Sequence, residues 1–147
     1  MGSVAKIERF QTLETTEDAS LQPFAPLLNR IRFAAAGCRA SARVDIFRAC
    51  ALLSLDASAA LDAHVEALVS TLSEAIGRRP VFLAPGTLEM SFDERWLLRL
   101  IERAYAQDRF SAAFLIGRRT RPEHGRALSF LVHGAARFAQ QVDDVSG

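Results

Sequence analysis

Residues 58–76 read SAALDAHVEALVSTLSEAI and carry the clearest structural signal in the chain. Large apolar side chains recur at intervals of three or four residues, at Leu61, Val65, Leu68, Leu72 and Ile76. This spacing gathers them on one side of a helix with about 3.6 residues per turn and leaves polar residues opposite. Gly77 follows directly, and glycine commonly ends a helix because it tolerates a left-handed backbone. The segment therefore predicts an amphipathic helix.

The same spacing predicts helices on both sides of this segment. They cover about 23–36, 41–54, 91–106, 108–115 and 120–141. Ser91 with Glu94 forms the capping-box pattern that starts a helix. Thr120 with Glu123 forms a second capping box before the last helix. The short helix between them is expected to end at Gly117.

One segment breaks the helical pattern. Residues 78–90, RRPVFLAPGTLEM, contain Pro80 and a Pro85–Gly86 turn, which exclude a continuous helix. The other connections are short, which favours antiparallel neighbours in one bundle. The sequence thus predicts an all-α, single-domain bundle of about six helices with a Pro/Gly-containing loop at about 78–90. Two three-helix subdomains divided at this loop are the alternative.

Polar segments flank the helical region. Residues 1–20 carry thinly spaced apolar side chains, so we expect a flexible N-terminal arm, a helical domain at 21–142 and a polar tail at 143–147. The arm holds no apolar run of the kind found in secretory signals. No stretch of the chain approaches the ~18 uninterrupted apolar residues of a membrane span. A membrane partner is therefore not expected.

Composition describes an ordinary globular domain. The chain has 147 residues, a formal net charge of +1, 50% hydrophobic and 24% charged residues. These values fit one folded domain and argue against bulk electrostatic attraction to nucleic acid or membranes. Cys38 and Cys50 stand in apolar surroundings, where we expect free thiols in a reducing cytoplasm. Lys6 is the single lysine among eighteen basic residues, and this bias toward arginine suggests a GC-rich bacterial genome.

The sequence carries no recognisable catalytic motif. Neither the glycine-rich nucleotide loops nor the G-x-S-x-G nucleophile elbow occurs. The three histidines and two cysteines lack the paired spacing of zinc ligands, so we expect no metal and no cofactor. The carboxylates of Glu94 and Glu102 could suggest acid–base catalysis, but a simpler explanation is better. Glu94 caps a helix, and Glu102 pairs with Arg99. His64 flanks the apolar stripe of its helix, where we expect a partly buried histidine with a satisfied hydrogen bond. An enzymatic function is not indicated.

Charge is distributed unevenly along the chain. The stretch from Arg109 to Arg137 contains six arginines and one acidic residue, Glu123, a local balance of +5. Its densest part is the GRRTR run at 117–121, directly before the last predicted helix. A helix N-terminus already attracts anions through its free N–H groups and its dipole. The cluster predicts affinity for phosphate, an acidic peptide or a carboxylate-rich surface, unless the arginines are merely solvated.

The last predicted helix extends this basic cluster along one side. A helical wheel aligns four residues opposite its apolar stripe, namely Arg126, Phe130, His133 and Arg137. An aromatic ring between arginines is typical of interaction hot spots, and Gly134 beside it would permit close approach of a partner. The alternative is that Phe130 is buried between two neighbouring helices. The candidate binding residues are therefore Arg118, Arg119, Arg121, Arg126, Phe130, His133 and Arg137.

These features support three functions. The leading expectation is a small cytoplasmic helical interaction or regulatory module that binds a protein partner, or itself, through this basic and aromatic face. A DNA-binding helix-turn-helix regulator is the first alternative, less favoured because Glu123 would meet the phosphate backbone. A sensor of an anionic ligand, held by Arg119, His124 and Arg126, is the second. Apolar residues outside the main stripes of several helices favour a homodimer.

Overall fold

The computed structural model describes residues 19–37 and 57–146 as an all-helical fold. The five α-helices of these residues are α2 (Ala25–Gly37), α4 (Ala57–Ile76), α5 (Phe92–Tyr105), α6 (Arg109–Arg119) and α7 (Gly125–Ser146). Two single-turn 3-10 helices precede α2 and α7, namely η1 (Gln22–Phe24) and η2 (Pro122–His124). The described residues contain no β-strand, so the predicted all-α class is confirmed.

Sequence periodicity located each of these five helices. The sixth predicted helix, at 41–54, lies outside the described residues, as do both cysteines and most of the N-terminal arm. The predicted loop at 78–90 is present between α4 and α5. At the other end of the chain, α7 continues to Ser146 instead of ending near Gln141.

Two predicted helix boundaries are wrong. Gly117 does not end α6, which continues through it, and Thr120 does not cap α7. The Thr120 hydroxyl donates instead to the Ile116 carbonyl oxygen at 2.7 Å. Pro122 forces an extended backbone on the residue before it, so the chain leaves α6, forms η2 and begins α7 only at Gly125.

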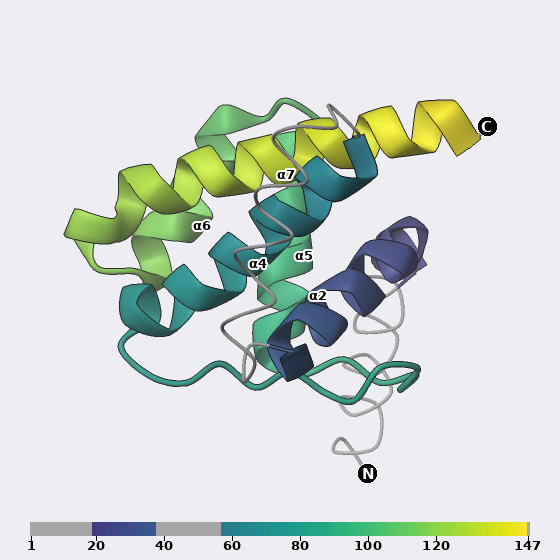
Figure 1. The fold of residues 1–147 in the computed structure, drawn as a ribbon. Coiled ribbons are helices and arrows are strands. Elements are labelled where there is room, and N and C mark those ends of the chain that lie inside the picture. The colour runs from purple at the N-terminus through teal and green to yellow at the C-terminus, as the bar shows by residue number, and fades with distance from the viewer. Residues whose placement is uncertain (1–18, 38–56, 147) are drawn as a thin grey trace, which may run out of the picture.

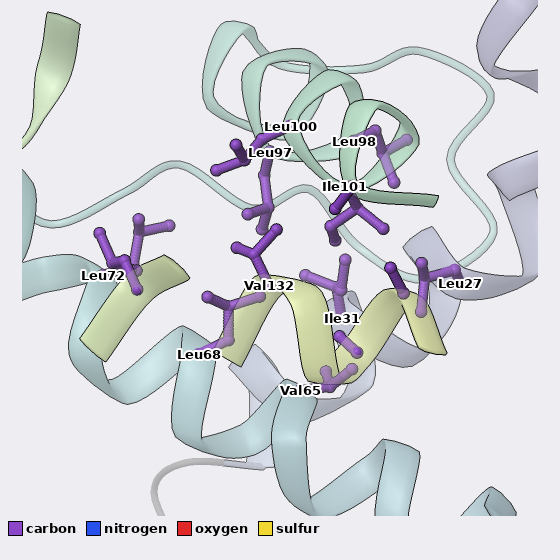
Figure 2. Packing of buried hydrophobic residues seen from close by; sticks show 14 of the residues in the cluster. Leu27, Ile31, Val65, Leu68, Leu72, Leu97, Leu98, Leu100, Ile101 and Val132 are labelled. Carbon is purple, nitrogen blue, oxygen red and sulfur yellow. The ribbon is translucent and has the colours of Figure 1, made fainter. Parts of the chain in front are cut away.

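One hydrophobic core joins α2, α4, α5 and α7. Figure 1 shows α4 and α7 running side by side, with α5 passing behind them. Leu68 of α4, Leu97 of α5 and Val132 of α7 are fully buried where these helices meet (Figure 2). The stripe predicted for α4 is buried from Leu61 to Leu72, which confirms its amphipathic assignment. Because three helices pack against α7, only one side of that helix is left for solvent.

A buried ion pair connects α2 to α5. Arg32 donates from Nε to Glu94 Oε2 at 2.7 Å and from Nη2 to Oε1 at 3.1 Å, and the two side chains are only 1% and 0% exposed. Arg32 also donates to the carbonyl oxygens of Thr87 and Glu89. Glu94 forms the predicted capping box with Ser91 as well. The pair therefore fixes the loop before α5 against the bundle, a contact that no local sequence pattern predicted.

Candidate functional site

The predicted arginine cluster at 118–121 is dispersed in the structure. Arg119 donates from Nη2 to Asp93 Oδ1 at 2.7 Å, and its guanidinium lies 4.8 Å and 4.9 Å from the ring centres of Phe92 and Trp96. Arg78 donates to the same carboxylate. Burial by itself raises the pKa of Asp93, but these hydrogen bonds hold that pKa well below its usual range. Arg119 therefore has a structural role, and its guanidinium is already engaged within the fold.

Arg118 and Arg121 point to different parts of the surface. Arg118 is exposed in the last turn of α6, with its guanidinium 5.8 Å from the Phe114 ring centre. The N–H of Arg121 donates to the Ala75 carbonyl oxygen at 2.9 Å, and its side chain lies beside Gly77 at the end of α4. Their closeness in the sequence predicted that the three arginines converge beside one helix N-terminus, and this prediction is wrong.

The four candidate residues on α7 do lie together, in one groove. The groove has a volume of about 710 Å³ and is formed by α7 and by the corner where α5 ends and α6 begins. Its lining from α7 includes the predicted Arg126, Phe130, His133 and Arg137. Its lining from the corner includes Tyr105, Gln107 and Arg109. This site is called the α7 groove below.

The aromatic ring of the α7 groove is accessible. Phe130 is 71% exposed. Arg126 and Arg137 are exposed beside it, and His133 is half-buried. The alternative in which neighbouring helices bury Phe130 is therefore wrong. An exposed phenylalanine flanked by arginines provides an apolar anchor with a polar rim.

The α7 groove is positively charged. Arg109, Arg126 and Arg137 line it, and no aspartate or glutamate does. None of these arginines forms an ion pair with a described residue, although Arg137 stacks on Phe138 at 5.1 Å. Burial, together with the nearby charge of Arg109, lowers the pKa of His133. The imidazole is therefore neutral near pH 7, and the three guanidinium groups supply the charge that an anionic group would meet.

Gln107 makes the turn that brings α6 to the groove. Its φ is 61°, in the left-handed region that favours glycine. The Gln107 N–H donates to the Ala104 carbonyl oxygen and the Asp108 N–H donates to that of Arg103, so α5 ends here. Asp108 then caps α6, whose first residue is Arg109. No sequence pattern marked this corner as part of the site, because its position beside α7 depends on helix packing.

Gly134 serves the packing of α7 on α4. A Cβ at this position would lie 2.5 Å from His64 Cδ2. The His64 Nδ1 is 2.9 Å from the Ala60 carbonyl oxygen, and its ring lies 5.0 Å from Phe138 and 6.2 Å from Phe130. His64 is thus the partly buried, hydrogen-bonded residue that the sequence predicted. The missing side chain of Gly134 leaves room for the His64 ring. The prediction that it permits close approach of a partner is therefore wrong.

We expect Gly134→Ala to lower the free energy of unfolding by about 1–3 kcal/mol, because overpacking against His64 exceeds the gain in helix propensity. In a His64→Ala background the same substitution should raise it by about 1 kcal/mol, the intrinsic advantage of alanine over glycine in a helix. Urea unfolding of the wild type, the two single variants and the double variant measures both values. A change of the same sign in the two backgrounds would contradict the assigned contact.

Glu102, the other carboxylate considered in the sequence, takes part in local ion pairs. Glu102 lies 3.6 Å from Arg99, the pair that the sequence predicted, and also contacts Arg103. Within the described part of the chain, no three His, Cys, Asp or Glu side chains gather where they could hold a metal ion. Over the same residues, no helix has the length and apolar character needed to cross a bilayer.

Fold and site together define an all-α protein with a basic and aromatic groove along its C-terminal helix. Comparison with known proteins adds no family to this description, since no protein-family model, curated protein or solved structure matches the chain. The α7 groove is therefore the feature of this protein that bears on its function.

Proposed function

We propose that the protein is a small cytoplasmic helical interaction module whose α7 groove binds an acidic segment of a protein partner. The observation that carries this proposal is the presence of Arg109, Arg126 and Arg137 in one groove without any lining carboxylate. A guanidinium can form two parallel hydrogen bonds with a carboxylate, which makes arginine the preferred residue for such recognition.

The shape of the groove favours a peptide segment over a small molecule. Its lining extends from Arg126 to Gln140, a rise of about 20 Å along α7. Charged groups stand near both ends, and the exposed ring of Phe130 stands between Arg126 and Arg137. This arrangement suits an extended or helical segment that presents carboxylates on either side of an apolar residue.

The proposal is tested with a fluorescein-labelled peptide of alternating glutamate and leucine, long enough to span the groove. Arg126→Glu with Arg137→Glu should weaken its binding about tenfold or more in an anisotropy titration, because two charge-assisted contacts become repulsive. The control, Arg79→Glu with Arg121→Glu, changes net charge equally at two exposed positions outside the groove. It should leave the affinity within about twofold of the wild type.

An equal loss in both double variants would show that the peptide responds only to overall charge, which overturns the proposal. A duplex DNA of arbitrary sequence is titrated under the same conditions. Tighter binding to DNA than to the peptide, with a steep decrease as salt is raised, would favour the DNA-binding alternative instead.

A further inference from the structure

The segment at 7–18, IERFQTLETTED, lies outside the described residues and combines acidic with large apolar side chains. From Phe10 to Asp18 it contains three carboxylates and no lysine or arginine. The α7 groove has the opposite character, because three arginines line it and no aspartate or glutamate does. Hydrogen bonds between guanidinium and carboxylate groups are among the stronger polar contacts in proteins. The chain therefore carries, next to its own fold, an acidic segment of the kind that suits the groove.

The order of side chains in this segment matches the order along α7. Two apolar and two acidic residues stand at i, i+3, i+4 and i+7, the spacing that shares one face of a helix, namely Phe10, Leu13, Glu14 and Glu17. On α7, Phe130 and Arg137 line the groove with the same separation as Phe10 and Glu17, a rise of about 10 Å. A segment that runs in the direction of α7 can therefore place an apolar ring at Phe130 and a carboxylate at Arg137.

The fold holds the chain at the edge of the groove directly after this segment. Leu21 is buried, and the Phe24 ring packs edge-on against the Tyr105 ring, with 5.6 Å between the ring centres. Tyr105 is one of the residues that line the α7 groove. The chain between Asp18 and Phe24 spans at most about 20 Å. Figure 1 shows the start of α2 on the side of the molecule where α7 ends, so the segment is attached near the Arg137 end of the groove.

A tether of this length favours binding within one chain. A short linker corresponds to an effective concentration on the order of millimolar, so a contact that is weak between separate molecules is populated within one. A partner with an acidic segment then competes with residues 7–18. Its apparent affinity is reduced in proportion to the fraction of molecules in which the groove is open.

We propose that residues 7–18 bind in the α7 groove of the same chain and that a protein partner has to displace them. Phe10 and Leu13 contact the exposed ring of Phe130. Glu14 and Glu17 bind the arginines of the groove. This inference rests on the preference for acidic segments that the proposed function gives to the groove, and it adds the regulation of that site.

Photo-cross-linking of the full chain tests the contact directly. Phe10→p-benzoylphenylalanine keeps an aromatic side chain at this position and makes it photoreactive. After irradiation, proteolysis and mass spectrometry locate the residues to which it has become attached. We expect a cross-link within one chain to the two stretches that line the groove, 104–109 and 126–140. Cross-links that avoid both stretches, or that form only between two chains, would overturn the proposal.

The two arginine double variants show whether charge holds the segment in place. Arg126→Glu with Arg137→Glu should lower the yield of the cross-link within one chain about fivefold or more, because the groove then repels the carboxylates. Arg79→Glu with Arg121→Glu changes net charge equally at exposed positions outside the groove. This control should leave the yield within about twofold of the parent protein. Equal yields in the two double variants would contradict the assigned contact.

Phe10→Ser with Leu13→Ser measures the competition without a change in net charge. Loss of both apolar side chains should release the segment and open the groove. The labelled glutamate–leucine peptide should then bind about threefold or more tighter than to the wild type. Phe33→Ser removes an exposed phenylalanine outside the groove and should leave the affinity within about twofold. An affinity equal to that of the wild type in the Phe10/Leu13 variant would refute the proposed competition.

Failure of this inference can be distinguished from failure of the proposed function. A cross-link to the groove, together with a labelled peptide that binds none of the variants, would support residues 7–18 as the occupant and refute binding of an acidic partner. Peptide binding that depends on Arg126 and Arg137, without any cross-link to the groove, would retain the proposed function and refute the role of residues 7–18.

Discussion

Replacing Arg32 with methionine is expected to lower the free energy of unfolding by about 3–5 kcal/mol. The substitution leaves the buried Glu94 carboxylate without its bidentate partner and removes the donors to the Thr87 and Glu89 carbonyl oxygens. An uncompensated charge inside a protein costs several kcal/mol, because little water reaches it. Urea unfolding, followed by circular dichroism, measures the difference between variant and wild type.

Arg30 provides a matched control on the same helix. Its salt bridge to Asp62 is 2.8 Å long, but the two side chains are 30% and 46% exposed. Arg30→Met should therefore cost no more than about 1 kcal/mol. Adding Glu94→Gln to Arg32→Met should recover part of the lost stability, because the neutral amide removes the unpaired buried charge. Equal costs for Arg30→Met and Arg32→Met would contradict the structural assignment of the buried pair.

Acidification is expected to destabilise the fold steeply below about pH 4. Burial raises the pKa values of Asp93 and Glu94, but hydrogen bonds from arginines and backbone N–H groups lower both pKa values overall. The folded state therefore keeps these carboxylates ionised at a pH where the unfolded chain binds protons. Their contribution is fully present above the unfolded pKa values, which are about 4, and is lost as the pH falls toward the folded values. When the pH lies between the folded and unfolded pKa values of such a carboxylate, each unit by which the pH falls lowers the free energy of unfolding by about 1.4 kcal/mol.

The measurement is a series of urea unfolding experiments from about pH 7 down to about pH 2.5. Asp93→Asn should be less stable than the wild type at neutral pH, because it weakens the contacts to Arg78 and Arg119. Its stability should also fall less steeply in acid, with a slope smaller by up to about 1.4 kcal/mol per pH unit. Parallel curves for the variant and the wild type would show that Asp93 does not titrate as the structure implies.

Local sequence patterns predicted the positions of the described helices correctly, but only some of the helix ends. Periodic apolar residues located α4 and α7, because helix formation depends on neighbours three and four positions apart. Ser91 and Glu94 formed the expected cap, whereas Thr120 and Glu123 did not, because Pro122 imposes its own backbone conformation on the chain before it. A capping pattern is therefore informative only when the residues inside it can take the helical conformation that it requires.

The candidate site was predictable in part for the same reason. Arg126, Phe130, His133 and Arg137 share one side of a helix, and a helical wheel shows this from the sequence alone. Gln107 and Arg109 complete the groove from a different element, which no spacing rule links to α7. The shape of a groove between two helices depends on the angle at which they pack. That angle depends on the whole core, so a local pattern does not predict it.

The amino-acid sequence by itself determined the helical class, the loop between α4 and α5, and the outward-facing side of α7, because each depends on residues within a few turns of one another. Only the tertiary structure decided which arginines are available to a partner. Arg119 and Arg126 have the same side chain and the same charge, yet the Asp93 carboxylate binds Arg119 while Arg126 lines an open groove. A guanidinium is available to a partner only when no carboxylate of the fold already binds it. For Arg119 that carboxylate belongs to Asp93, which lies on another helix, 26 residues away along the chain.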